Sequence, residues 1–178
     1  KKILKAIFKP RLVLNYILKR IHWYMIGWYQ EKSWAKKDSD SIKNDENVLF
    51  VDLGANLGQG YSWFSNYFNQ DNVVFELFEP NPFCYEELIK LPAIVSGDVN
   101  VHNVGVGPAT GSFKFYGLAD NEGGELSQGG STVKEHNSDW YDASDDSAID
   151  VDVINFEDYL IKKSKAFGNP SVRTKRYC

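Results

Sequence analysis

Two acidic residues and two glycines form the part of the sequence best suited to binding a ligand. Asp52 follows an apolar run and precedes Gly54 and Gly58, and Glu79 ends a second apolar run 27 residues after Asp52. Glycines leave room for a ligand against the backbone and adopt dihedral angles that other residues avoid. A carboxylate in the place of Glu79 can accept hydrogen bonds from the hydroxyls of a ribose. The four residues therefore predict a nucleoside-binding site.

The spacing of the glycines discriminates between nucleoside cofactors. A dinucleotide site favours G-x-G-x-x-G, but three residues separate Gly54 from Gly58, and Asn56 stands where the second glycine is expected. No Gly-Lys-Ser/Thr follows the glycines, which excludes a P-loop. S-adenosylmethionine has no phosphate and carries an ammonium and a sulfonium group, which the charge of Asp52 matches. The residues favour this cofactor, and an NAD-dependent oxidoreductase remains an alternative because Glu79 suits either nucleoside.

Both acids also have simpler interpretations. Asp52 could cap the following helix, and Glu79 could be a surface acid before a turn. The order of the surrounding segments favours the ligand site: an apolar run, an acid, glycines, a helical segment, a second apolar run and a second acid.

The elements that must position these residues alternate between strand and helix. Apolar runs at 48–51, 73–78 and 99–106 predict parallel strands buried on both faces. Between them, residues 61–69 and the segment that begins at Asn81-Pro82 have helical periodicity, and these two residues suit a helix start. This order predicts a doubly wound α/β sheet.

The second half of the chain predicts shorter elements. Gly111 to Tyr116 alternates like an edge strand, Ile149 to Ile154 is also strand-like, and Phe156 to Lys163 predicts one or two helical turns. Residues 117–147 are rich in Gly, Ser, Asn and Asp and have no period. A segment of this length is either a lid over the ligand, through Gly123-Gly124 and Gly129 to Thr132, or a flexible loop.

Three motifs in this order resemble those of FkbM-type methyltransferases. They are V-D-L-G-A-N-L-G at 51–58, F-E-P-N-P at 78–82, and V-N-V-H-N-V-G-V-G at 99–107, which leads into G-S-F-K-F. The resemblance covers roughly residues 48–160. It implies a class I methyltransferase-like (Rossmann-like) fold, S-adenosylmethionine as cofactor, and methylation of hydroxyl groups, commonly on sugars or sugar-bearing natural products.

The resemblance also assigns cofactor-binding residues. Those implied to line the methionine part of the cofactor are Asp52, Gly54, Asn56 and Gly58, and Ala55 is a further cofactor-binding residue in the same turn. Glu79 is implied to hold the ribose, with Pro80 and Asn81 beside the adenosine. Those implied to lie near the adenine edge are Asn103, Val104 and Gly105.

The chain departs from the family after the predicted helix at 156–163. The family continues into a core strand with a Lys-x-Asp-x-Glu-Gly stretch, which this sequence lacks. We therefore expect a basic aromatic helical extension at 1–34, a polar linker at 35–47, a partial, truncated methyltransferase domain at 48–167 and an irregular tail at 168–178. A cofactor-binding remnant without activity is accordingly a second alternative function.

Charge is distributed unevenly along the chain. Residues 1–30 contain seven basic and no acidic residues, whereas the other 148 contain 13 basic and 24 acidic residues. An acidic body disfavours nucleic-acid binding. The basic extension could contact an anionic membrane surface, or it could pack on its own domain or on a second subunit. Two widely separated cysteines and the lack of a long uncharged apolar stretch predict a cytoplasmic location.

No residue stands out as a catalytic base. His136 lies in the long acidic loop, His102 within a predicted strand, and His22 in the basic extension. We expect His102 to pack or form hydrogen bonds, and Cys84 to be a small core residue. No grouping of His, Cys and acids has the spacing of a metal site, so we expect no metal.

Overall fold

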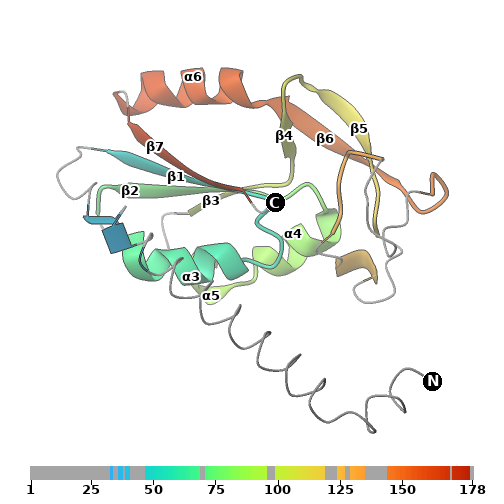
Figure 1. Cartoon of the computed structure of the whole chain (residues 1–178), viewed down its shortest axis with the longest axis horizontal. Helices are drawn as coiled ribbons and strands as arrows, with labels where there is room; N and C mark the ends of the chain where they lie inside the picture. Colours follow the sequence, from blue (N-terminus) through green and yellow to red (C-terminus); the bar gives the residue numbers. More distant parts are fainter. Residues whose placement is uncertain are drawn as a thin grey trace, which may run out of the picture. The chain divides into compact units, whose positions relative to one another are not determined.

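The structure is a computed structural model (Figure 1), and it describes residues 33, 36–37, 39–40, 47–68, 71–95, 99–118, 124–126, 129–134, 144–168 and 170–176. The chain divides into two compact units, Lys1–Lys43 and Asn44–Cys178. The helical extension expected at 1–30 lies outside the described residues. Lys36, Lys37, Ser39 and Asp40, within the segment expected as a polar linker at 35–47, are helical. Polar composition does not exclude a helix, and lysine is a good helix former.

The second unit is built on a four-stranded parallel sheet. Strand β1 (Val48–Leu53) has β2 (Val73–Phe78) and then β3 (Val99–His102) on one side, and β7 (Ser171–Arg176) on the other. The apolar runs of β1 and β2 are almost completely buried, as expected for central parallel strands. The unit is thus an α/β fold with parallel β-α-β units. Because β2 and β3 extend to one side of β1 and β7 pairs on the other, the order reverses between β1 and β7.

Helices cover both faces of this sheet (Figure 1). On one face lie α3 (Gln59–Phe68), α4 (Pro82–Leu88) and α5 (Pro92–Val95). Their core is aromatic, since the ring of Phe50 lies 5.0–5.3 Å from the rings of Phe64, Phe68 and Phe75. On the other face, α6 (Phe156–Phe167) packs Tyr159 and Leu160 against a cluster of Leu49, Val51 and Phe78.

A second, three-stranded sheet adjoins the first. Its order is β4 (Gly105–Gly107), β6 (Ile149–Asn155) and β5 (Gly111–Phe115), with β4 parallel and β5 antiparallel to β6. The edge strand predicted from Gly111 is confirmed. The short helix η1 (Gly124–Leu126) follows β5 in the chain.

The single strand predicted at 99–106 is wrong. The chain leaves the first sheet after His102, and residues 105–107 pair with β6 in the second sheet. The break falls at Asn103, whose side-chain amide donates to the backbone oxygens of Glu79 (2.8 Å) and Pro80 (3.3 Å). These bonds fix the chain to the turn after β2, where it changes direction.

The irregular tail expected at 168–178 is also wrong, because β7 spans Ser171–Arg176. Gly168 adopts the left-handed conformation (φ 69°) and ends α6, and the chain then pairs along the full length of β1, from Val48 opposite Ser171 to Leu53 opposite Arg176. A strand buried on both faces needs partners for its backbone on both edges. β7 fills the edge of β1 that faces away from β2, and the compact unit extends beyond residue 167.

Candidate functional site

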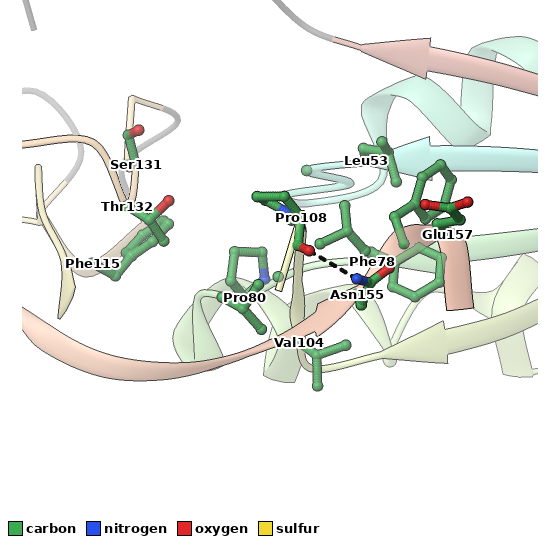
Figure 2. Close-up of a pocket in the computed structure, with 17 residues that line it drawn as sticks. Leu53, Phe78, Pro80, Val104, Pro108, Phe115, Ser131, Thr132, Asn155 and Glu157 are labelled. Atoms are coloured by element: carbon green, nitrogen blue, oxygen red, sulfur yellow. Dashed lines mark hydrogen bonds between the residues drawn. The ribbon is translucent and has the colours of Figure 1, made fainter. Parts of the chain in front are cut away.

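A cavity of about 720 Å³ lies at the carboxyl ends of β1 and β2 and against the second sheet (Figure 2). In open parallel sheets, ligands bind beyond the carboxyl ends of the strands, where the strand order reverses. The volume is within the range of small-molecule sites. The lining residues come from the ends of β1 and β2, the 104–108 segment, β5, β6, α6 and the 130–132 segment: Leu53, Gly54, Phe78, Pro80, Val104, Gly105, Val106, Gly107, Pro108, Phe115, Gly130, Ser131, Thr132, Val153, Asn155, Phe156 and Glu157.

The turn after β1 exposes backbone to this cavity at Gly54. Gly54 has a φ of 81°, and a Cβ added there would meet nothing within 4 Å. The amides of Gly54 and Ala55 donate to the backbone oxygen of Phe78 at 2.9 and 3.0 Å. Asn56 follows with a φ of 48°, which is unusual for a residue with a side chain. The turn is thus fixed on β2 and leaves open space at Gly54, as the sequence predicts.

Gly58 has a different function from the one expected. A Cβ at Gly58 would lie 2.5 Å from a methyl group of Leu91 and 2.9 Å from one of Leu88. The absent side chain therefore allows α3 to begin close to α4 and its following turn. The expectation that Gly58 leaves room for a cofactor is wrong, since leucine side chains occupy that space.

Substitution of Gly58 should accordingly destabilise the fold more than substitution of Gly54. Both glycines have left-handed φ angles, so alanine introduces about 1–2 kcal/mol of backbone strain at either position. Only Gly58→Ala adds an overlap with packed side chains, for about 1–3 kcal/mol more. Urea unfolding of the two variants measures the difference. Equal losses of stability would contradict the packing function of Gly58.

Glu79 is a buried acid held by two backbone amides. Its side chain is 4% exposed, so the interpretation as a surface acid is wrong. One carboxylate oxygen accepts the amide of Asn56 at 2.6 Å, and the other accepts the amide of Asn81 at 2.8 Å. Burial raises the pKa of Glu79, nearby Asp52 raises it further, and the two amides oppose the rise. The Glu79 carboxylate therefore joins the turn after β1 to the turn after β2.

Asp52 is completely buried within β1. The interpretation as a helix cap is wrong, because Asp52 belongs to the strand and α3 begins only at Gln59. Its influence on the pKa of Glu79 means that two carboxyl groups share this end of the sheet. Negative charge at the ends of β1 and β2 favours a neutral or cationic ligand group.

Asn81 and Asn56 hold the two turns together behind the cavity wall. Asn81 caps α4 by accepting the amide of Phe83 at 3.0 Å, and its side-chain amide donates to the backbone oxygen of Glu125 at 2.7 Å. The side-chain amides of Asn81 and Asn56 also lie 3.3 and 3.4 Å from the sulfur of Cys84. Burial raises the pKa of the Cys84 thiol to about 12, so Cys84 is the core residue expected.

Four of the cofactor-binding residues expected from the sequence line the cavity: Gly54, Pro80, Val104 and Gly105. The other seven do not: Asp52, Ala55, Asn56, Gly58, Glu79, Asn81 and Asn103. Among these seven, Glu79 and Asn103 hold the turns that carry the lining residues, through Asn56 and Pro80 respectively.

The opposite wall was not assigned residue by residue from the sequence. Phe115, Ser131 and Thr132 line it, and the 129–134 segment is joined to the end of β5 by the backbone pairing of Tyr116 with Ser131. Gly130 lies flat on Phe115, since an added Cβ would lie 2.3 Å from that ring. Gly130, Ser131 and Thr132 thus border the cavity, and the interpretation of Gly129 to Thr132 as a lid stays a prediction.

A buried acid on β2 supports the floor of the cavity. Glu76 is 0% exposed and accepts hydrogen bonds from Asn100, His102, Tyr159 and Lys163. Burial alone would raise the pKa of Glu76, but the bonds from His102, Lys163 and Tyr159 lower it to about 2. This network joins β2, β3 and α6.

The Glu76 network also fixes aromatic rings that reach the cavity. His102 stacks on Phe78 at 4.7 Å between centroids, and Tyr159 meets the same ring edge-on at 5.0 Å. Phe156 lies parallel to Tyr159 at 6.5 Å. Phe78 and Phe156 both line the cavity. The expectation that His102 packs and forms a hydrogen bond is thus confirmed, whereas Glu76 was not singled out.

Comparison with family models, with curated proteins and with solved structures found no match to this chain in any of the three.

Proposed function

We propose that this chain binds S-adenosylmethionine in the cavity and transfers its methyl group to a hydroxyl of a sugar or glycoconjugate. The observation that carries the proposal is the charge around the cavity. Among the described lining residues, none is a lysine, arginine or histidine, and one, Glu157, is an acid. A cationic cofactor suits such a site, and a pyrophosphate does not.

The residues present fit this cofactor. Open space at Gly54 admits a ligand against the backbone. The resemblance assigns the ribose to Glu79, which lies behind the cavity wall and holds the turn at Asn56. Pro80, Val104 and Gly105 provide an apolar wall for a base. The resemblance to FkbM-type methyltransferases supports the same assignment and implies the class I methyltransferase-like fold, of which the parallel α/β sheet is the general frame.

The reaction would be an in-line displacement. The cofactor, when bound, supplies a methyl group on a positively charged sulfur. The residues of the cavity hold the acceptor oxygen in line with that methyl group, and such positioning can supply much of the rate enhancement. Phe115, Ser131 and Thr132, from the wall opposite β1, are the residues we assign to the acceptor side.

Two further parts of the proposal concern location. No helix in the described part of the chain is both long and apolar enough to cross a bilayer. We propose a cytoplasmic protein, with contact to an anionic membrane through residues 1–30 as one role for the basic extension and packing on a protein surface as the other.

Methyl transfer is tested with labelled S-adenosylmethionine and a panel of sugars and glycolipids. We expect label in a hydroxyl-bearing acceptor. Cofactor binding without transfer to any member of the panel would instead favour the binding-only alternative. An NAD-dependent reaction would favour the oxidoreductase, whose cofactor the acidic surroundings of the cavity disfavour.

A further inference from the structure

Glu157 stands on a fixed part of the cavity rim. It occupies the first turn of α6, two residues after the N-cap Asn155, whose side-chain oxygen accepts the amide of Asp158 at 3.1 Å. The side-chain amide of Asn155 donates to the backbone oxygen of Pro108 at 2.8 Å. The start of α6 is therefore tied to the segment between β4 and β5, and the backbone that carries Glu157 is held in place.

Glu157 differs chemically from every other described residue of the cavity wall. It is the one lining residue with an ionisable side chain; the polar remainder, Ser131, Thr132 and Asn155, is uncharged. The side chain of Asn155 is already hydrogen-bonded to Pro108 and to the amide of Asp158. Among the described lining residues, Glu157 is therefore the one that can distinguish a charged ligand from a neutral one.

Glu157 lies at the same end of the cavity as Gly54. Leu53 and Phe156, the residues next to Gly54 and Glu157, pack against the same buried cluster. Figure 2 shows Leu53 and Glu157 at one end of the view and Phe115, Ser131 and Thr132 at the other. The resemblance assigns Gly54 to the methionine part of the cofactor, so the sulfonium group would lie at this end of the cavity.

We propose that the Glu157 carboxylate recognises the sulfonium charge and makes the cavity prefer S-adenosylmethionine to its neutral product. This inference rests on the proposed function. On transfer, the acceptor hydroxyl oxygen would bond to the methyl carbon as the carbon–sulfur bond breaks. The sulfur would keep the bonding electron pair and become neutral, and the hydroxyl proton would leave to solvent. The attraction to Glu157 disappears with the sulfonium charge, which aids product release. Glu157 is thus a specificity-determining residue.

The test is calorimetric titration of the full chain with S-adenosylmethionine and with S-adenosylhomocysteine, which differ in the methyl group and the sulfonium charge. Glu157→Gln removes the charge and keeps the shape of the side chain. Asp158→Asn is the matched control, because Asp158 is an exposed acid in the same helical turn that does not line the cavity. Both variants lose one favourable interaction with the helix dipole.

Glu157 is exposed at the cavity rim, so solvent partly screens its charge. We expect Glu157→Gln to weaken binding of S-adenosylmethionine about two- to fivefold, the scale of an exposed charge contact, and to leave binding of S-adenosylhomocysteine unchanged. Asp158→Asn should leave both affinities unchanged. Equal effects of Glu157→Gln on the two ligands, or no effect on either, would overturn the inference and leave the proposed function intact. If the unmodified chain binds neither ligand, the proposed function fails and this inference fails with it.

Discussion

Replacement of Glu76 by glutamine should lower the free energy of unfolding by about 3 kcal/mol at neutral pH. Glu76 is 0% exposed and is paired with Lys163 and hydrogen-bonded by His102, Tyr159 and Asn100. Removing the charge leaves a buried amide among donors that were arranged for a carboxylate. Breaking a buried ion pair is costly because the remaining partner keeps its desolvation penalty.

The loss should depend on pH in a defined direction. The pKa of Glu76 is lowered from an ordinary 4.5 to about 2, so the folded state favours the charged carboxylate. The stabilisation is complete above pH 4.5 and is lost as the pH falls from 4.5 toward 2. The stability difference between the parent and Glu76→Gln should therefore narrow below pH 4.5. Denaturant unfolding across this range measures it.

Asp150→Asn is the matched control for Glu76→Gln. Asp150 pairs with Lys114 at 3.1 Å, but both side chains are about half exposed or more. An exposed pair contributes roughly 0–1 kcal/mol, so this variant should remain close to the parent. If Glu76→Gln is no more destabilising than Asp150→Asn, the Glu76 network does not hold α6 on the sheet.

Glu79→Ala should weaken S-adenosylmethionine binding by about 1.5–3 kcal/mol, the scale of hydrogen bonds to a charged group. The variant removes the acceptor for the ribose and also the two bonds that hold the amides of Asn56 and Asn81. Because burial raises the pKa of Glu79, the affinity of the parent should begin to fall at a higher pH than an ordinary glutamate would give. Calorimetry at several pH values measures both effects.

Glu86→Ala is the control for the change in net charge, since Glu86 is an exposed acid on α4 away from the cavity. Its affinity should match that of the parent. The thermal unfolding temperature of each variant separates lost binding from lost structure. A Glu79→Ala protein that remains folded and binds the cofactor as tightly as the parent would show that Glu79 only connects the two turns.

The central part of the fold could be predicted because local signals agree there. The apolar runs of β1 and β2, and the Asn81-Pro82 start of α4, each carry their own information. The sequence of β7 gives little local indication of a buried strand, because Ser171–Arg176 is mostly polar and basic. It forms through pairing with β1, a tertiary effect that propensity does not contain. Its signal was indirect: Gly168 and Pro170 mark the end of α6.

Residues of the candidate site could be predicted only where the adjacent sequence marks the end of a strand. Gly54 and Pro80 lie at strand ends that the sequence identifies, and both line the cavity. Gly58 has the same residue type and the same φ as Gly54, yet it faces leucines that the sequence cannot place. Glu76 offered one signal, a charge within an apolar strand, but its partner Lys163 is 87 residues away. A contact between residues so far apart in the chain cannot be inferred from the spacing of residues within a motif.

The central claim is that the cavity at the ends of β1 and β2 binds S-adenosylmethionine. The most direct test is calorimetric titration of the folded chain with S-adenosylmethionine, S-adenosylhomocysteine and NAD under one set of conditions. We expect one site that takes both sulfur compounds and binds NAD more weakly, because the described cavity wall offers a pyrophosphate one acid, Glu157, and no lysine, arginine or histidine. Tighter binding of NAD than of either sulfur compound would contradict it.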